Sequence, residues 1–238
     1  MRKPVTLIAG QFGSRHFGTR PYLEAAVRST RKEAPTALYI GAANGEDDSF
    51  GTALCALIAA AGAKDVAWPK VAARRRDRAA ARKALERVDF VFVGGGDVEA
   101  GMGALREAEL IADLHAAAAR GAVFAGMSAG AIMLGERWVR WPHPEAGDDE
   151  AETYECLALA SCSLDTHGEA DEWRETRSFV AVRARELERK AKAYGVPSGG
   201  ALLVGSGGKI TARGKPVLVF AALPRGDATV EMTLPVKT

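Results

Sequence analysis

The sequence predicts an α/β fold, in which residues 1–238 form a single three-layer domain with a mostly parallel sheet and a C-terminal β-hairpin. Short apolar runs alternate five times with stretches whose apolar residues recur at helical spacing. That alternation is typical of parallel strands joined by right-handed helical crossovers, with helices on both faces of the sheet. Residues 201–238 instead contain short apolar runs separated by glycine-rich turns. This second pattern favours antiparallel strands.

The expected elements begin with the apolar run 5–9, which Gly10 ends. Further parallel strands are expected at 37–40, 66–68, 88–93 and 122–125, with helices at 22–31, 50–61, 74–87 and 102–120 between them. A helix starts at 131–134, and the apolar segment 157–164 is expected to end as a strand. A helix is then expected over 173–194 and a turn over 195–200. Short strands follow at 201–204, 209–212, 217–221 and 229–234, with 205–208 as a hairpin turn.

Composition and charge exclude several classes of protein. Apolar residues make up 47% of the chain, charged residues 26%, and the net charge is +2, so no strong field attracts nucleic acid or an anionic membrane. The basic cluster 74–78 contains no aromatic residue for base stacking. No run approaches the roughly 18 apolar residues of a membrane helix, and run 5–9 is too short for a signal peptide. We therefore expect neither a nucleic-acid nor a membrane partner.

The cysteines indicate the compartment. Cys55, Cys156 and Cys162 form neither a close CxxC pair nor a disulfide framework. That usage fits a reducing environment, so we expect a cytoplasmic protein. We expect no metal and no cofactor.

The stretch Gly126-Met127-Ser128-Ala129-Gly130 has the GxSxG pattern of a nucleophile elbow. In that geometry a sharp turn between strand and helix presents the serine hydroxyl above the edge of the sheet. The backbone N–H of Ala129 would face the same point, where an oxyanion develops. The pattern arises by chance about 0.1 times in a chain of this composition, so its context is decisive. An apolar strand before it and a helix after it supply that context.

A second loop, Gly94-Gly95-Gly96-Asp97, follows the fourth predicted strand. Both loops lie at the carboxyl ends of strands, where open α/β sheets bind ligands. The backbone N–H of Gly95 or Gly96 could supply the second oxyanion donor, although a tight turn would also explain the glycines. A dinucleotide site is disfavoured because the loop is not GxGxxG and Asp97 occupies the place of a phosphate.

A serine nucleophile requires a base, and histidine is the usual one. Of the four histidines, His167 is best placed, at a strand end downstream of the elbow; the others are His16, His115 and His143. Asp165 lies two residues earlier and would share a face with His167 on an extended segment, so it is the first candidate for the third member. Glu169, Asp171 and Glu172 are alternatives, although all these acids could simply begin a helix.

The segment between elbow and histidine is unusual in composition. Residues 137–144 are rich in Trp, Pro and His, and residues 145–155 contain six acids. So much negative charge is expected in a solvated loop that flanks the site. Such a loop could also close over a substrate.

Together, the glycine loop, the elbow and Asp165-Thr166-His167 resemble the peptidase E and cyanophycinase family of serine peptidases, whose fold is flavodoxin-like and similar to class I glutamine amidotransferases. The resemblance implies Ser128 as nucleophile and His167 as base. It implies Gly95 or Gly96, with Ala129, as oxyanion donors. It also implies a small aspartyl or β-aspartyl peptide as substrate, for which we assign Asp97, Arg174 and Arg177 as binding residues. A homodimer is compatible with the resemblance.

One position departs from the family pattern. The family's third catalytic residue is a glutamate in a segment similar to 195–202, where this chain has Ser198. A serine can orient an imidazole but cannot offset the charge of an imidazolium, and losing the acid costs on the order of 10⁴ in kcat. Either another acid substitutes, or the protein is a non-catalytic binding or regulatory member of the fold.

Two other enzyme classes fit less well. A glutaminase of the amidotransferase type would need a cysteine in the elbow, and none of the three cysteines lies there. An α/β-hydrolase would place its acid before its histidine, as Asp148, Asp149 or Asp165 would allow. It would also need an HGGG-type loop, which the sequence lacks.

Overall fold

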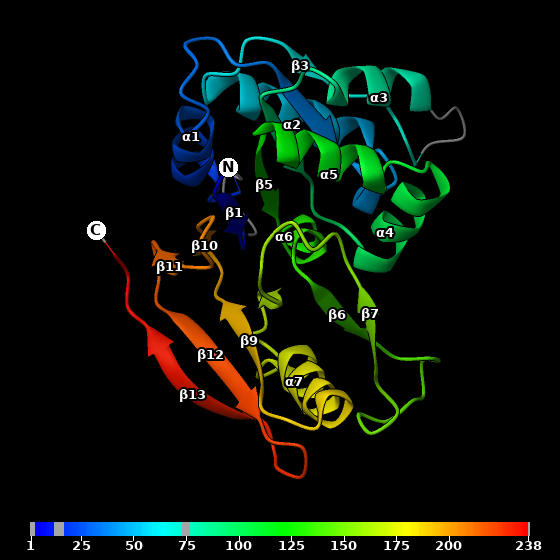
Figure 1. Cartoon of the computed structure of the whole chain (residues 1–238), viewed down its shortest axis with the longest axis vertical. Helices are drawn as coiled ribbons and strands as arrows, with labels where there is room; N and C mark the ends of the chain where they lie inside the picture. Colours follow the sequence, from blue (N-terminus) through cyan, green and yellow to red (C-terminus); the bar gives the residue numbers. More distant parts are fainter. Residues whose placement is uncertain (1–2, 12–16, 73–76, 238) are drawn as a thin grey trace.

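The computed structural model describes residues 3–11, 17–72 and 77–237. A seven-stranded sheet in the order β11-β10-β1-β5-β4-β2-β3 forms its centre (Figure 1). Five of these strands are parallel: β1 (Val5–Ile8), β2 (Ala37–Ile40), β3 (Val66–Ala67), β4 (Phe90–Val93) and β5 (Val123–Met127). The hairpin β10 (Ala201–Val204) and β11 (Ile210–Arg213) extends the sheet antiparallel to β1.

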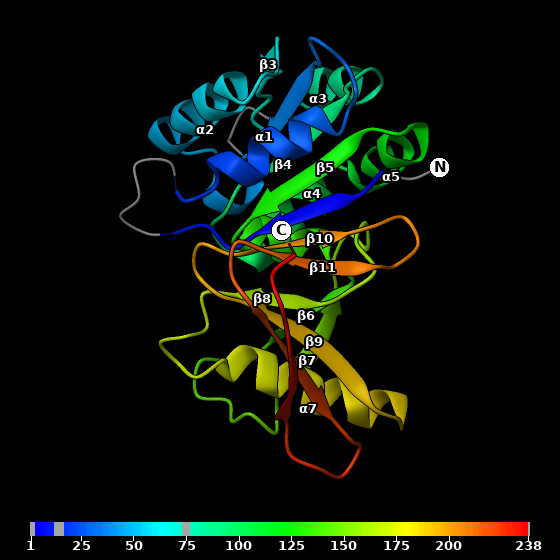
Figure 2. The same ribbon diagram turned by 90° about the vertical axis from the view of Figure 1, so that its left-hand side faces the viewer.

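Helices cover both faces of this sheet (Figure 2). In β2, Leu38 and Ile40 face one core, while Ala37 and Tyr39 face the other. The first core is closed by α3 (Arg78–Leu85), α4 (Val98–Glu107), α5 (Ile111–Arg120) and α6 (Ala129–Leu134). The second is closed by α1 (Arg20–Arg28) and α2 (Asp48–Ala60), and the short 3-10 helix η1 (Ala42–Asn44) follows β2. The predicted α/β architecture with a mostly parallel sheet is therefore confirmed.

A second sheet lies below the first in Figure 1, in the order β13-β12-β9-β8. Its strands are β8 (Leu164–Thr166), β9 (Ala191–Val196), β12 (Val217–Ala222) and β13 (Thr229–Leu234). Helix α7 (Arg174–Leu187) packs against it through Phe179, which contacts the core that also contains Ala193 and Phe220. A separate hairpin pairs β6 (Arg137–Arg140) with β7 (Glu152–Glu155).

Three expectations about these elements were wrong. The helix expected over 173–194 ends at Leu187, and β9 follows it. The alternating burial of β9 is a strand signal that the charged residues before it obscured. The helix expected over 102–120 is two helices, α4 and α5. Both ends of the segment 137–155, expected as a loop, pair as strands.

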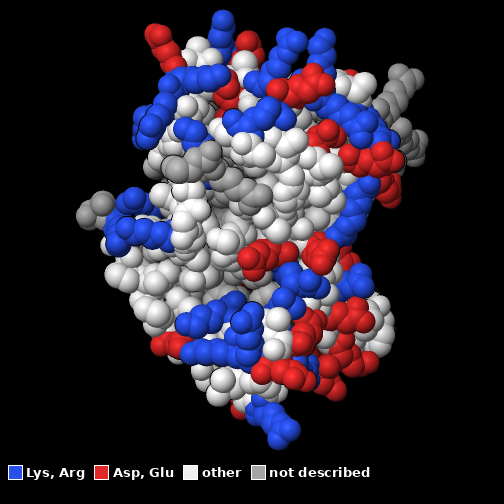
Figure 3. All heavy atoms as spheres, in the orientation of Figure 1, with Lys and Arg blue, Asp and Glu red and all other residues white. Residues whose placement is uncertain are grey.

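Two surface properties follow from the fold. Within the described ranges, no helix is long and apolar enough to cross a membrane. Positive and negative side chains are intermingled over the face shown in Figure 3, in keeping with the net charge of +2.

Candidate active site

Ser128 occupies a strained turn between β5 and α6. Its φ of 53° and ψ of −126° are unusual for a residue with a side chain, and such strain collects at functional sites. It is the one residue in 122–135 that is not buried. Close backbone contacts explain both flanking glycines: a Cβ on Gly126 would lie 2.4 Å from the Gly130 oxygen, and one on Gly130 would lie 2.2 Å from the Val93 oxygen. The geometry is that of a nucleophile elbow.

The glycine loop lies against this serine. A Cβ on Gly95 would be 3.1 Å from the Ser128 Cβ, so the loop backbone contacts the serine side chain. The N–H groups of Gly95 and Ala129 make no hydrogen bond to the part of the chain that the structure describes. Both donors belong to residues next to Ser128 and have no partner among the described residues, so they are available to an oxyanion. Asp97 has a structural role, because its Oδ1 accepts a hydrogen bond of 2.7 Å from the Ala100 N–H and caps α4.

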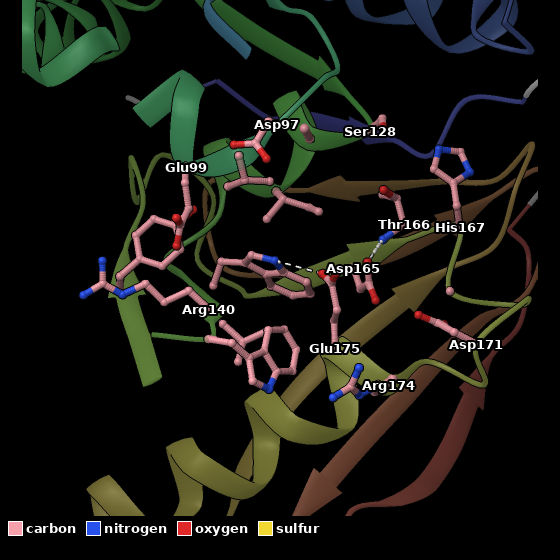
Figure 4. Close-up of a pocket in the computed structure, with 18 of the residues that line it drawn as sticks. Asp97, Glu99, Ser128, Arg140, Asp165, Thr166, His167, Asp171, Arg174 and Glu175 are labelled. Carbon is pink, nitrogen blue, oxygen red and sulfur yellow. Dashed lines mark hydrogen bonds between the residues drawn. The ribbon is translucent and has the colours of Figure 1, made fainter. Parts of the chain in front are cut away.

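His167 follows β8 and lies next to Ser128. Figure 4 shows its ring beside Ser128 at one end of a cavity, and the two residues line that cavity together. The chain reaches this position through a left-handed residue, with φ of 67° at His167, and through the parallel pairing of β8 with β9. The sheet that holds Ser128 and the sheet that holds His167 meet here.

A serine and a glutamate lie behind the imidazole. His167 Nδ1 is 3.0 Å from Ser198 Oγ, which is 3.4 Å from Glu169 Oε2. The Ser198 N–H donates a 2.7 Å hydrogen bond to Glu169 Oε1, which holds the carboxylate in place. Because a hydroxyl both accepts and donates, Ser198 can accept from Nδ1 and donate to Glu169. At the position where the resemblance implies a glutamate, this chain therefore has Ser198, and the carboxylate of Glu169 lies on the other side of that serine from the imidazole.

Burial and charge act in opposite directions on His167. Desolvation lowers the pKa of its imidazole, whereas the negative charge of Glu169 and a hydrogen bond with the backbone of Ala9 raise it. The net effect is a lowered pKa. A lowered pKa favours the neutral ring, which is the form that can accept a proton.

Asp165, the first candidate for the third catalytic residue, has other partners. Its Oδ1 accepts a 2.6 Å hydrogen bond from the Thr166 N–H, and its Oδ2 accepts one of 2.9 Å from Thr176 Oγ1. In Figure 4 it lies beside Glu175. Burial, reinforced by the charge of Glu175, raises the pKa of Asp165 to about 7. The carboxylate linked to the His167 imidazole through Ser198 is therefore that of Glu169 and not that of Asp165.

The other histidines lie elsewhere. His115 is in α5 and is not among the lining residues of either cavity described below. His143 is exposed at the cavity rim, with its ring nitrogens 3.7 Å from Glu145 and Glu150. His16 falls outside the described residues.

The two arginines assigned to an acidic substrate are both engaged. Arg174 lines the cavity, but its Nη2 donates a 2.7 Å bond to Asp148, and its guanidinium lies 5.1 Å from the Trp141 ring centre. Arg177 donates to the backbone oxygens of Glu172 and Ala228 and is not among the cavity residues. The acidic segment 145–155 is thus partly neutralised by arginines around the site.

Two cavities meet at Ser128, His167 and Gly96. The larger, of about 840 Å³, extends between α4, the β6–β7 hairpin and the start of α7. The smaller, of about 410 Å³, lies toward β1 and α2. Sequence analysis did not identify several wall residues, namely Trp138, Trp141, Tyr154, Phe17 and Phe50. For Trp138 and Trp141, the Trp-rich composition of 137–144 was the available signal.

No group of three or more His, Cys, Asp or Glu residues that could hold a metal ion occurs in residues 3–11, 17–72 and 77–237. Carboxylates also line the larger cavity: Asp97, Glu99, Asp165, Asp171 and Glu175.

Comparison with known proteins identifies the family. The sequence model of peptidase family S51 matches residues 8–212. The chain belongs to peptidase family S51. This membership supports a peptidase function, and the resemblance to peptidase E is confirmed. A comparison with curated proteins found no match.

Two solved structures share the fold of this S51 chain. A crystal structure of a peptidase from an acI-B1 Actinobacterium is 15% identical, with a TM-score of 0.71 over 98% of this chain and 97% of its own. A putative peptidase E protein from Listeria monocytogenes EGD-e is 15% identical, with a TM-score of 0.58 over 90% of this chain and 98% of its own. At these identities the similarity establishes the fold alone.

Proposed function

We propose that this S51 protein is a serine peptidase that hydrolyses short peptides, with Ser128 as nucleophile and His167 as general base. The observation that carries the proposal is the strained, accessible Ser128 beside two free backbone donors. His167, with a lowered pKa, lies alongside. Family membership supports the same reaction class.

The proposed reaction follows the acyl-transfer scheme. Ser128 Oγ attacks the scissile carbonyl carbon while His167 takes the hydroxyl proton. The N–H groups of Gly95 and Ala129 bind the oxyanion. His167 then donates its proton to the leaving amine, and water hydrolyses the acyl-enzyme with His167 again acting as base. Ser198 holds the ring orientation, and Glu169 offsets part of the imidazolium charge.

The substrate class is supported by fewer observations than the reaction type. The resemblance implies aspartyl or β-aspartyl peptides, and that preference stays a prediction. Arg174 is ion-paired to Asp148, and Arg140, also in the wall, is ion-paired to Glu152. An acidic side chain in the larger cavity would have to displace one of these partners while facing several carboxylates. The combined cavity volume does fit a short peptide.

A fluorophosphonate probe tests the proposal, because it phosphonylates activated serines. We expect labelling of the wild-type protein, none of Ser128→Ala, and unchanged labelling of the exposed control Ser49→Ala on α2. Hydrolysis of short peptides should be lost in the same variant. If the wild-type protein is not labelled and hydrolyses none of the peptides, the second candidate function applies. That function is a non-catalytic binding protein, and Ser198 in place of a glutamate is the observation that favours it.

A further inference from the structure

The smaller cavity adjoins Ser128 toward β1 and α2, whereas the larger one lies toward α4, the β6–β7 hairpin and α7. Ser128, His167 and Gly96 line both cavities. A peptide whose carbonyl lies at Ser128 therefore extends into the larger cavity on one side and the smaller on the other. The smaller cavity thus contacts a substrate residue next to the scissile bond.

Its walls are apolar. Phe17 and Phe50 meet edge to face, with ring centres 5.3 Å apart. Met127 and Ala9, at the ends of β5 and β1, complete the wall. Nearly all of the accessible surface of this cavity is carbon or sulfur, in contrast to the carboxylates of the larger cavity.

Gln11, Asn44 and Asp47 also line this cavity, and the side chains of Asn44 and Asp47 already have partners. Asn44 Nδ2 lies 3.1 Å from both Tyr39 Oη and the Gly95 oxygen, and Asn44 Oδ1 accepts from the Asp47 N–H at 3.2 Å. Asp47 Oδ1 accepts from the Phe50 N–H at 2.7 Å and caps α2. The lining includes no lysine and no arginine among the described residues. Among these described residues, a substrate carboxylate would lose its hydration without gaining a cation.

We propose that this cavity is a specificity pocket for an apolar side chain, aromatic or branched aliphatic, on the substrate residue that flanks the scissile bond. The inference rests on the proposed peptidase function for its position relative to the reaction. Its volume of about 410 Å³ accommodates a phenylalanine or leucine side chain. Burial of such a side chain against apolar walls favours binding by roughly tenfold to a hundredfold over an alanine.

Binding by the Ser128→Ala protein, which prevents turnover, tests the preference. Calorimetry compares blocked tripeptides Ala-X-Ala, with X as Phe, Leu, Asp or Lys. We expect the Phe and Leu peptides to bind at least tenfold more tightly than the Asp peptide. Phe50→Ser in the same background should reduce that ratio several-fold, whereas Phe50→Leu should largely retain it. Ser49→Ala, on the same helix but outside the cavity, is the matched control and should not change it.

Equal or tighter binding of the Asp peptide overturns the inference, and so does a ratio that Phe50→Ser leaves unchanged. If Phe50→Ser does not fold, the ratio of Phe and Leu to Asp peptide binding by the Ser128→Ala protein still decides. Failure of the proposed function has a different signature, since it is the absence of fluorophosphonate labelling at Ser128. Labelling together with a preference for the Asp peptide would leave the peptidase proposal intact and refute the apolar pocket alone.

Discussion

Glu169 is expected to support catalysis through Ser198, and replacing it with glutamine tests this. The two contacts of 3.0 and 3.4 Å place its carboxylate at most about 6.4 Å from His167 Nδ1. At that separation, an imidazolium and a carboxylate attract by about 0.6 kcal/mol at the dielectric constant of water and about 2.6 kcal/mol at an effective value of 20. Because Glu169 is exposed, the lower half of this range applies, and Glu169→Gln should lower kcat by about 3- to 10-fold.

The pH profile separates this electrostatic role from a structural one. The charge of Glu169 raises the pKa of His167, so its removal lowers that pKa. The acid limb of the kcat/KM profile should then move to lower pH while the plateau falls. Steady-state hydrolysis of a short peptide between pH 4 and 9 measures both effects.

A matched control comes from the same loop. Glu172→Gln removes an equally exposed charge whose side chain does not contact Ser198 or His167 in the described structure. It should change neither the plateau nor the acid limb. The reasoning is refuted if Glu169→Gln leaves both unchanged, or if Glu172→Gln has the same effect. Ser198→Ala, which removes the bridging hydroxyl, should lower kcat by at least as much as Glu169→Gln.

Two further predictions concern stability. Gly130→Ala would drive a Cβ to 2.2 Å from the Val93 oxygen and should destabilise the fold by about 2–4 kcal/mol in urea unfolding; Gly103→Ala, in α4 with nothing within 4 Å, should instead stabilise by about 0.5–1 kcal/mol. For Asp165, whose pKa is raised to about 7 in the fold from about 3.9 when unfolded, folding favours the protonated form. The stabilisation from the protonated Asp165 is therefore complete below about pH 4 and lost as the pH rises to about 7. The free energy of unfolding then changes by at most about 1.4 kcal/mol per pH unit. The urea concentration at the unfolding midpoint should decrease as the pH rises from 5 to 8 in the wild type, and should change less in Asp165→Asn. Equal pH dependence of the two proteins would count against the raised pKa of Asp165.

The elements that sequence analysis located correctly depend on local patterns in the sequence. The alternation of apolar runs with helical stretches sets the parallel sheet, because each unit buries its apolar face within a few tens of residues. The elbow at Ser128 and the glycine loop at Gly95 depend on backbone geometry that only short glycine-containing motifs allow. A histidine at a strand end is likewise a local pattern, and the structure places His167 beside Ser128.

Tertiary structure alone decided what surrounds those residues. Glu169 and Ser198 are 29 residues apart, and only the pairing of β8 with β9 brings the carboxylate behind the imidazole. The apolar cavity joins Phe17, from the loop before α1, with Phe50 on α2. The strand β9 was mistaken for helix because its six residues directly follow the charged pattern of α7, and the partners β8 and β12 that stabilise it as a strand are distant in sequence. Local motifs thus determined which atoms are available for chemistry, and long-range pairing determined which charges and which apolar surfaces those atoms face.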